Sequence, residues 1–210
     1  MLEQIYQIQK DSGQRVSHVV VMGTGEPLDN QENLVQFIRL LSNPHGLGIS
    51  QRNITVSTCG LADKILELAK EKLGITLALS LHAPNQALRE SIMPIAKKYP
   101  LHEVLDACRI YQKDTGRRVS FEYSMIQGIN DHTDYAKELA GLLKGFIGHV
   151  NLIPLNPIDE REYSPANKKQ IFSFYHILEN AGIPVTIRRE MGRDIQGACG
   201  QLRKYQKQGW

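Results

Sequence analysis

Short apolar runs of strand length alternate with helical patterns along this chain, and the strand runs end in small polar clusters. This alternation predicts repeated βα units around a parallel sheet, because parallel strands need a crossover that is usually a helix. The carboxyl ends of such strands lie at one edge, where β/α proteins build their sites. We therefore expect the polar clusters to form one site. The expected strands are about residues 17–22, 54–56, 75–81, 119–123, 149–153 and 185–187.

Apolar residues at helical spacing fill the segments between these strands. Leu34, Phe37, Ile38 and Leu41, for example, share one helix face. Because a helical pattern precedes the first strand, we expect the chain to open in the middle of a βα repeat. The pattern predicts an α/β fold, either a full or partial (β/α) barrel or an open doubly wound sheet. We interpret the chain as the later part of a larger enzyme whose first barrel strand is missing.

The composition is that of an ordinary soluble domain. The chain has 210 residues, of which 41% are hydrophobic and 22% charged, and we expect one domain over residues 1–210. A net charge of +3 permits a nucleic-acid partner without arguing for one. We find neither a signal peptide nor the ~20-residue apolar run of a membrane helix. Three cysteines make no disulfide framework, so we expect a reduced, cytoplasmic protein with no membrane partner.

The first polar cluster is Gly23-Thr24-Gly25-Glu26-Pro27. It begins like a dinucleotide fingerprint but fails as one, because Leu28 stands where the third glycine belongs. Its glycines could expose backbone groups to an amino-acid-like ligand, and Glu26 could balance an ammonium or sulfonium charge. A tight βα turn, in which Glu26 caps the following helix, explains the same residues equally well.

The next two clusters contain Ser57 and then Ser80 with His82. Such small donors and acceptors suit the hydroxyls of a ribose and the carboxylate of an amino acid. Each residue taken alone is more simply a cap or turn residue. Taken together on neighbouring strand ends, they favour a ligand.

The three cysteines have different settings. Cys199 is flanked by glycine and alanine, which leave a thiol accessible, so it is the best candidate nucleophile. Cys108 lies on an apolar helix face and is expected in the core. Cys59 lies at the expected edge, where packing is favoured over chemistry. Their spacing predicts no metal ligands in this chain.

Five motifs follow one another in this order: Met-Gly-Thr-Gly-Glu-Pro-Leu, Val-Ser-Thr-Cys-Gly, Ser-Leu-His-Ala-Pro-Asn, Asn-Leu-Ile-Pro-Leu-Asn-Pro and Ala-Cys-Gly-Gln-Leu. With them the chain resembles the radical S-adenosylmethionine (SAM) adenine C2 methyltransferases, which modify 23S ribosomal RNA and certain transfer RNAs. The resemblance implies a partial (β/α) barrel of the radical SAM type. Antibiotic-resistance relatives that methylate C8 of the same ribosomal adenine share much of the pattern, so C2 and C8 both stay open.

The resemblance also implies cofactors, partners and residue roles. These enzymes use SAM and a 4Fe-4S cluster, and they draw electrons from a donor such as flavodoxin or ferredoxin. The methyl group passes through an S-methylcysteine to the adenine of 23S rRNA or tRNA. The matching SAM contacts are Gly25, Glu26, Ser57, Ser80, Leu81, His82 and Asn156, and the matching methyl carrier is Cys199 in a C-terminal segment of about residues 190–210.

The chain departs from that pattern in its cysteines. The family's Cys-x-x-x-Cys-x-x-Cys run, its resolving cysteine and its N-terminal helical domain have no counterpart in these 210 residues. Without three thiolates a cluster has no protein ligands, so we expect the isolated chain not to perform the reaction. Two other interpretations stay open. One is an inactive SAM- or RNA-binding barrel, or half of a split enzyme. The other is an unrelated β/α-barrel lyase or isomerase, which should carry a lysine or paired acids at its strand ends.

Overall fold

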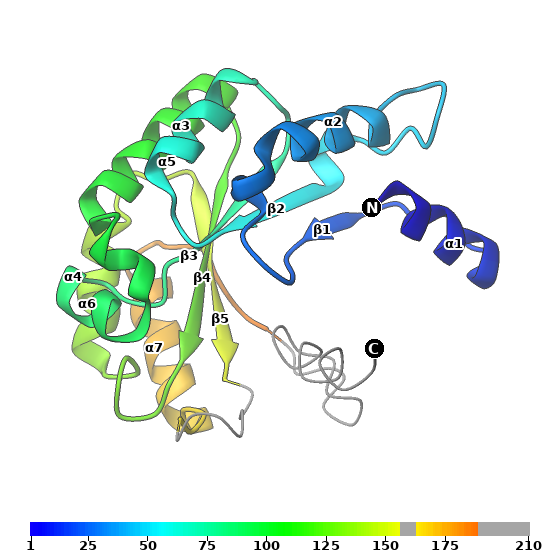
Figure 1. Cartoon of the computed structure of the whole chain (residues 1–210). Helices are drawn as coiled ribbons and strands as arrows, with labels where there is room; N and C mark the ends of the chain where they lie inside the picture. The colour runs from blue at the N-terminus through cyan, green and yellow to red at the C-terminus, as the bar shows by residue number, and fades with distance from the viewer. Residues whose placement is uncertain (156–162, 189–210) are drawn as a thin grey trace, which may run out of the picture.

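In the part of the chain that the structure describes, six parallel strands form one sheet in which spatial order equals chain order (Figure 1). The structure is a computed structural model and describes residues 1–155 and 163–188. Within those residues β1 pairs with β2 and β6 pairs with β5, which leaves the sheet open at both ends. The strands are β1 (Val19–Val21), β2 (Ile54–Thr58), β3 (Thr76–Ser80), β4 (Val119–Met125), β5 (Gly148–Pro154) and β6 (Val185–Ile187).

Helices connect the strands and cover one face of the sheet (Figure 1). Helix α3 packs against α5, and α6 packs against α7. The α-helices are α1 (Leu2–Ser12), α2 (Gln31–Leu41), α3 (Ala62–Lys70), α4 (Gln86–Ile92), α5 (Leu101–Thr115), α6 (Thr133–Leu142) and α7 (Lys168–Asn180). Short 3-10 helices within residues 1–155 and 163–188 are η1 (Pro27–Asn30), η2 (Gln51–Asn53) and η3 (Pro94–Lys97).

The hydrophobic core lies between the sheet and its helices. On β4, Phe121 meets Phe146 edge to face with ring centroids 5.1 Å apart, and Tyr123 contacts Phe174 of α7 at 5.1 Å. Because side chains alternate along a strand, the residues between them point to the opposite face. That opposite face, called the inner face below, carries Ser57, Ser80 and Glu122, whereas the helix-covered face is apolar.

The observed topology confirms the α/β prediction and decides between its two forms. A doubly wound sheet reverses its strand order and covers both faces with helices. Here the order is sequential and the inner face is polar, as in part of a (β/α) barrel. The first strand is shorter than expected, Val19–Val21 instead of 17–22. Asn53 Nδ2 donates to Ser17 O at 3.1 Å, so a side chain takes the place of strand pairing there.

The described helices contain no segment that is both long and apolar enough to cross a membrane.

Candidate functional site

Glu26 joins the loop after β1 to the loop after β2. Its Oε2 accepts a hydrogen bond from Cys59 N at 2.7 Å, and its Oε1 accepts one from Leu28 N at 3.1 Å. The second bond makes Glu26 the N-cap of η1, so the capping prediction is confirmed. The residue is only half-buried, and a carboxylate has about four acceptor positions. Capping therefore leaves Glu26 able to accept from a ligand as well.

Gly25 gives the same loop its shape. Its φ of 117° lies in a region that L side chains rarely adopt, and a Cβ built there would meet no atom within 4 Å. The residues from Gly23 to Gly25 are exposed. The glycine is thus required by the backbone conformation, and the turn leaves its peptide groups accessible.

Ser57 and Ser80 lie on the inner face of neighbouring strands. Ser57 Oγ donates to Val21 O at 3.1 Å, which links β2 to the end of β1. Ser80 is the last residue of β3, and its carbonyl accepts from Arg89 Nη2 at 3.3 Å. Both residues are half-buried and therefore reachable from the inner face. Leu81 follows Ser80 and is fully buried; its N–H donates to Glu122 O at 3.0 Å and its carbonyl accepts from Ala83 N at 2.8 Å.

His82 is held at three of its four polar groups. Its N–H donates to Glu122 O at 3.2 Å, its carbonyl accepts from Asn130 Nδ2 at 2.8 Å, and its Nδ1 accepts from Ser124 N at 3.0 Å. These bonds maintain a left-handed backbone, with φ of 56°. Because a backbone N–H occupies Nδ1, the hydrogen-bond network assigns the neutral ring's hydrogen to Nε2.

Burial of the imidazole, followed by the nearby charge of Arg89, lowers the pKa of His82 to about 4. The ring is therefore neutral at physiological pH, and Nε2–H is a donor rather than part of a cation. Such a donor suits a carboxylate or hydroxyl oxygen of a ligand.

Asn130 holds His82 in place, and sequence reasoning missed it. The residue is fully buried, and its Nδ2 donates to both His82 O (2.8 Å) and Ser124 O (2.7 Å). Its Oδ1 accepts from Ile126 N at 2.7 Å. In the sequence Asn130 reads as an ordinary turn residue after β4, and no local signal marks contacts 48 positions away.

Arg89 links the end of β2 to the end of β3, and sequence reasoning also missed it. Its side chain is fully buried, and Nη2 donates to Cys59 O at 2.8 Å and to Ser80 O at 3.3 Å. Among the described residues its Nε and Nη1 have no hydrogen-bond partner. A Cβ at Gly60 would lie 2.9 Å from Nη2, so glycine is needed beside this guanidinium. An arginine on a short helix gives no sequence signal of burial.

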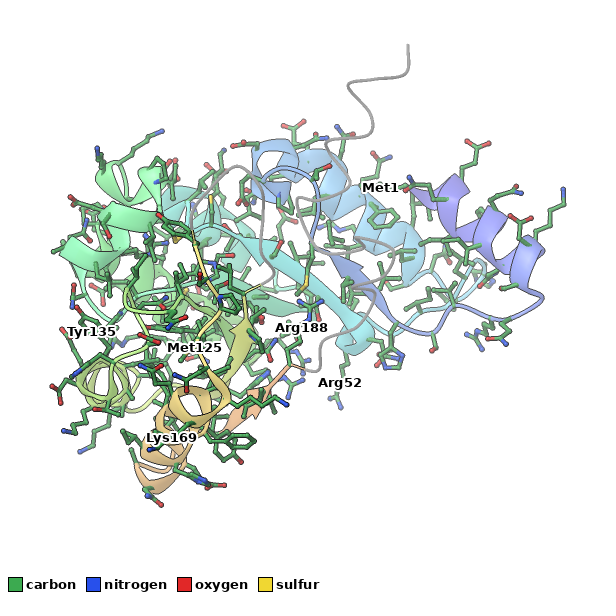
Figure 2. The ribbon with its side chains drawn as sticks, turned by 90° about the horizontal axis from the view of Figure 1, so that it is seen from below. Met1, Arg52, Met125, Tyr135, Lys169 and Arg188 are labelled. Carbon is green, nitrogen blue, oxygen red and sulfur yellow. The ribbon has the colours of Figure 1, made fainter. Side chains whose placement is uncertain are left out.

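A row of hydrogen bonds crosses the inner face from β4 to β6. Ser120 Oγ donates to Glu122 Oε1 at 2.7 Å, and Asn151 Nδ2 donates to Glu122 Oε2 at 2.8 Å. Thr186 Oγ1 in turn donates to Asn151 Oδ1 at 3.2 Å. Figure 2 labels Met125, the last residue of β4, and Arg188, which directly follows β6; they mark the ends of these two strands. In the sequence, Glu122 lies within the expected strand at about residues 119–123, and sequence reasoning gave it no role.

The two described cysteines are not activated thiols. Burial, together with a hydrogen bond to Glu26 and that residue's charge, raises the pKa of Cys59 to about 12. Burial likewise raises the pKa of Cys108 to about 12, and Cys108 is fully buried on α5, which confirms its place in the core. Two other predicted site residues, Asn156 and Cys199, lie outside the described residues.

The residues at hand fit SAM better than they fit an iron–sulfur cluster. Acceptors at Glu26, a neutral donor at His82 and hydroxyls at Ser57 and Ser80 form a set suited to an amino acid joined to a nucleoside. No group of three histidine, cysteine or acidic side chains in the described ranges could hold a metal ion. Cys59 and Cys108 alone do not form the thiolate set that a cluster takes.

Comparison with known proteins gives the family. The family model of the radical SAM superfamily matches residues 2–140. A probable dual-specificity RNA methyltransferase RlmN from Lachnospira eligens is 61% identical over 203 residues, which are 97% of this chain and 58% of that protein. Another from Clostridioides difficile is 53% identical and covers 99% and 60%, respectively. The chain thus spans about three-fifths of the length of these relatives.

Solved structures agree. A radical SAM methyltransferase from Sphaerobacter thermophilus superposes with a TM-score of 0.88 at 45% identity, over 93% of this chain and 57% of that one. A domain of a pyruvate-formate lyase-activating enzyme from Bacteroides vulgatus, at 20% identity and a TM-score of 0.64, shares the fold. With its partial barrel, its polar strand edge and the match over residues 2–140, this chain belongs to the radical SAM superfamily.

Proposed function

We propose that the chain is the barrel portion of a radical SAM RNA methyltransferase that methylates C2 of an adenine in 23S rRNA and tRNA. The observation that carries the proposal is the strand edge, where hydrogen bonds to neighbouring backbone groups fix Glu26, Ser57 and the Ser80–His82 segment in place. The similarity to proteins named RNA methyltransferases supplies the substrate class. The choice of C2 over C8 and of these particular RNAs follows the resemblance of the five motifs.

The residues of the edge would hold SAM by its two ends. Glu26 has acceptor positions left for the ammonium of the methionyl group, and Gly25 beside it leaves peptide groups open. Ser57, Ser80 and the Nε2–H of His82 offer hydroxyls and a neutral donor to the remaining polar atoms. Leu81 and Asn156 are proposed from their motifs alone. When bound, SAM supplies a methyl group and a source of the 5′-deoxyadenosyl radical.

Cys199 is the proposed methyl carrier. Its glycine and alanine neighbours give a thiol the access that a methyl transfer needs. Cys59 is the alternative thiol near the edge, but burial and Glu26 hold its pKa at about 12, so it stays protonated at neutral pH. This contrast favours Cys199 as the nucleophile.

The cluster is the part that these residues do not supply. We propose that a 4Fe-4S cluster and an electron donor such as flavodoxin or ferredoxin serve the whole enzyme in the cytoplasm, and that the chain as given binds SAM without completing the reaction. An inactive SAM- or RNA-binding barrel, or half of a split enzyme, is the second candidate, and the set of cysteines favours it.

A binding and product experiment tests the proposal. We expect isothermal titration calorimetry to detect SAM binding to the full 210-residue chain and about tenfold weaker binding to Glu26→Gln, which keeps one acceptor but loses the charge. Glu32→Gln, an exposed acid on α2, is the control and should bind as the wild type does. Absence of SAM binding in the wild type would contradict the proposal.

RNA digests then separate the catalytic alternatives. Mass spectrometry of 23S rRNA and tRNA incubated with chain, SAM and reductant should show no methylated adenosine above a Cys199→Ala control. Appearance of 2-methyladenosine would show that the chain is complete in activity. Appearance of 8-methyladenosine would assign it to the C8-methylating relatives.

A further inference from the structure

Glu122 and its partners extend the polar edge beyond the residues that the proposed function uses. Across the strand pairs β3–β4, β4–β5 and β5–β6, the registered partners are Ser80, Glu122, Asn151 and Thr186. Ser80 is one of the proposed SAM contacts, whereas the other three have no role so far. Registered partners on parallel strands lie side by side. A ligand that contacts Ser80 therefore also lies beside Glu122.

Glu122 is a buried carboxylate without a cation. Only 8% of its surface is exposed, and none of the ion pairs within residues 1–155 and 163–188 includes it. Its partners there, Ser120 and Asn151, are neutral donors. Burial of an uncompensated carboxylate is costly, and such groups gather at functional sites.

The carboxylate is also fixed in orientation and incompletely satisfied. Ser120 occupies one acceptor position on Oε1 and Asn151 one on Oε2, which leaves about two of roughly four positions open. Thr186 donates to Asn151 Oδ1 and so directs the amide's N–H groups toward Glu122. An oriented carboxylate with one free position on each oxygen is suited to a pair of adjacent hydroxyl donors.

We propose that Glu122 binds the vicinal 2′- and 3′-hydroxyls of the nucleoside and thereby selects a ribonucleoside over its deoxy counterpart. The inference rests on the proposed function, because it assumes that the ligand at Ser80 is SAM. The two carboxylates then have separate tasks. Glu26, in the loop after β1, faces the amino group of the ligand, and Glu122, on β4, faces its sugar.

The test compares S-adenosylhomocysteine with its 2′-deoxy analogue on the full chain by calorimetry. We expect the wild type to bind the ribonucleoside about tenfold more tightly, as a hydrogen bond to a charged group allows. Glu122→Gln should reduce that ratio to about two. Glu32→Gln, the exposed acid on α2, is the control, since it removes a carboxylate outside this row of hydrogen bonds, and it should preserve the ratio.

Two outcomes would overturn the inference. One is a wild type that does not distinguish the two compounds. The other is a Glu122→Gln variant that keeps the wild-type ratio, whether or not it loses affinity for both compounds. If Glu122→Gln does not fold, Thr186→Val, at the exposed end of the row, should still lower the ratio two- to threefold, and an unchanged ratio there overturns the inference as well. Failure of the wild type to bind either compound contradicts the proposed function itself, and it is recognised before any variant is measured.

Discussion

His82 shows how one residue can combine backbone strain, a fixed tautomer and a shifted pKa. Its left-handed φ of 56° and the bond from Ser124 N to Nδ1 depend on each other, because the turn brings the ring under the amide. A proton on Nδ1 would break that bond. The same turn buries the ring near Arg89, and this burial, followed by the charge of Arg89, lowers the pKa of His82 to about 4.

Stability should consequently fall in acid. The unfolded imidazole titrates near 6.5, so the unfolded state binds more protons between about pH 6.5 and 4. The contribution of His82 is fully present above about pH 6.5 and is lost as pH falls toward 4. Part of the residue stays accessible, so we expect a loss of roughly 1–2 kcal/mol between pH 7 and 5. Urea denaturation at several pH values measures it.

His82→Asn is the matched control for that titration. Asparagine tolerates a left-handed backbone and offers Oδ1 as an acceptor for Ser124 N, but it carries no titrating group. Its stability should depend less on pH than that of the wild type over the same range. Equal pH dependence in both proteins would show that other groups cause the loss.

Asn130 supplies the second residue-scale prediction. Replacement by alanine leaves His82 O, Ser124 O and Ile126 N without their partner in a buried place. We expect Asn130→Ala to cost about 3 kcal/mol of unfolding free energy. Asn33→Ala removes an exposed bond to Asn30 and should cost less than about 0.5 kcal/mol. A similar small cost for both variants in urea denaturation would show that the hydrogen bonds of Asn130 do not stabilise the fold.

At the scale of elements, the turn after β2 depends on Gly60. Its φ of 100° and the 2.9 Å approach of Arg89 Nη2 to a Cβ there both exclude a side chain. Gly25 has a similar φ, 117°, but open space around it. We expect Gly25→Ala to cost about 1 kcal/mol from backbone strain, and Gly60→Ala about 2 kcal/mol more from the clash. Thermal denaturation of the two variants separates the terms, and equal costs would show that Arg89 moves aside freely.

Much of this element level could be predicted from the sequence. The apolar runs gave the strands within one or two residues, since strands covered on one face by helices need apolar side chains there. The sequence also predicted that the polar clusters lie at one edge of the sheet, because the carboxyl ends of parallel strands lie together. Arg89 and Asn130 could not be predicted. Arg89 acts on carbonyls nine and 30 positions away, and Asn130 acts on one 48 positions away, through contacts that only folding creates. Glu122 was visible as a polar residue, but its row with Asn151 required the strand register.

At the scale of the whole molecule, the strand edge favours ligand binding, whereas the cysteines do not favour cluster binding. The edge has the donors and acceptors that we propose bind SAM, while two of the three cysteines are protonated core or packing residues. A chain that spans about three-fifths of its relatives can hold the ligand-binding half of a site without the metal-binding half. Whether the chain binds a 4Fe-4S cluster is therefore the measurement that best separates these two halves.

Anaerobic reconstitution with iron and sulfide should leave the 210-residue chain with well under one 4Fe-4S cluster per protein and with no change in its visible spectrum when SAM is added. The physical reason is that Cys59 and Cys108 have pKa values raised to about 12, so neither readily gives the thiolate that iron needs. The double variant Cys59→Ser, Cys108→Ser should bind the same small amount of iron as the wild type. A stoichiometric, SAM-responsive cluster that disappears in the double variant would mean that these thiols are ligands after all, and the division between the two halves of the site would then be wrong.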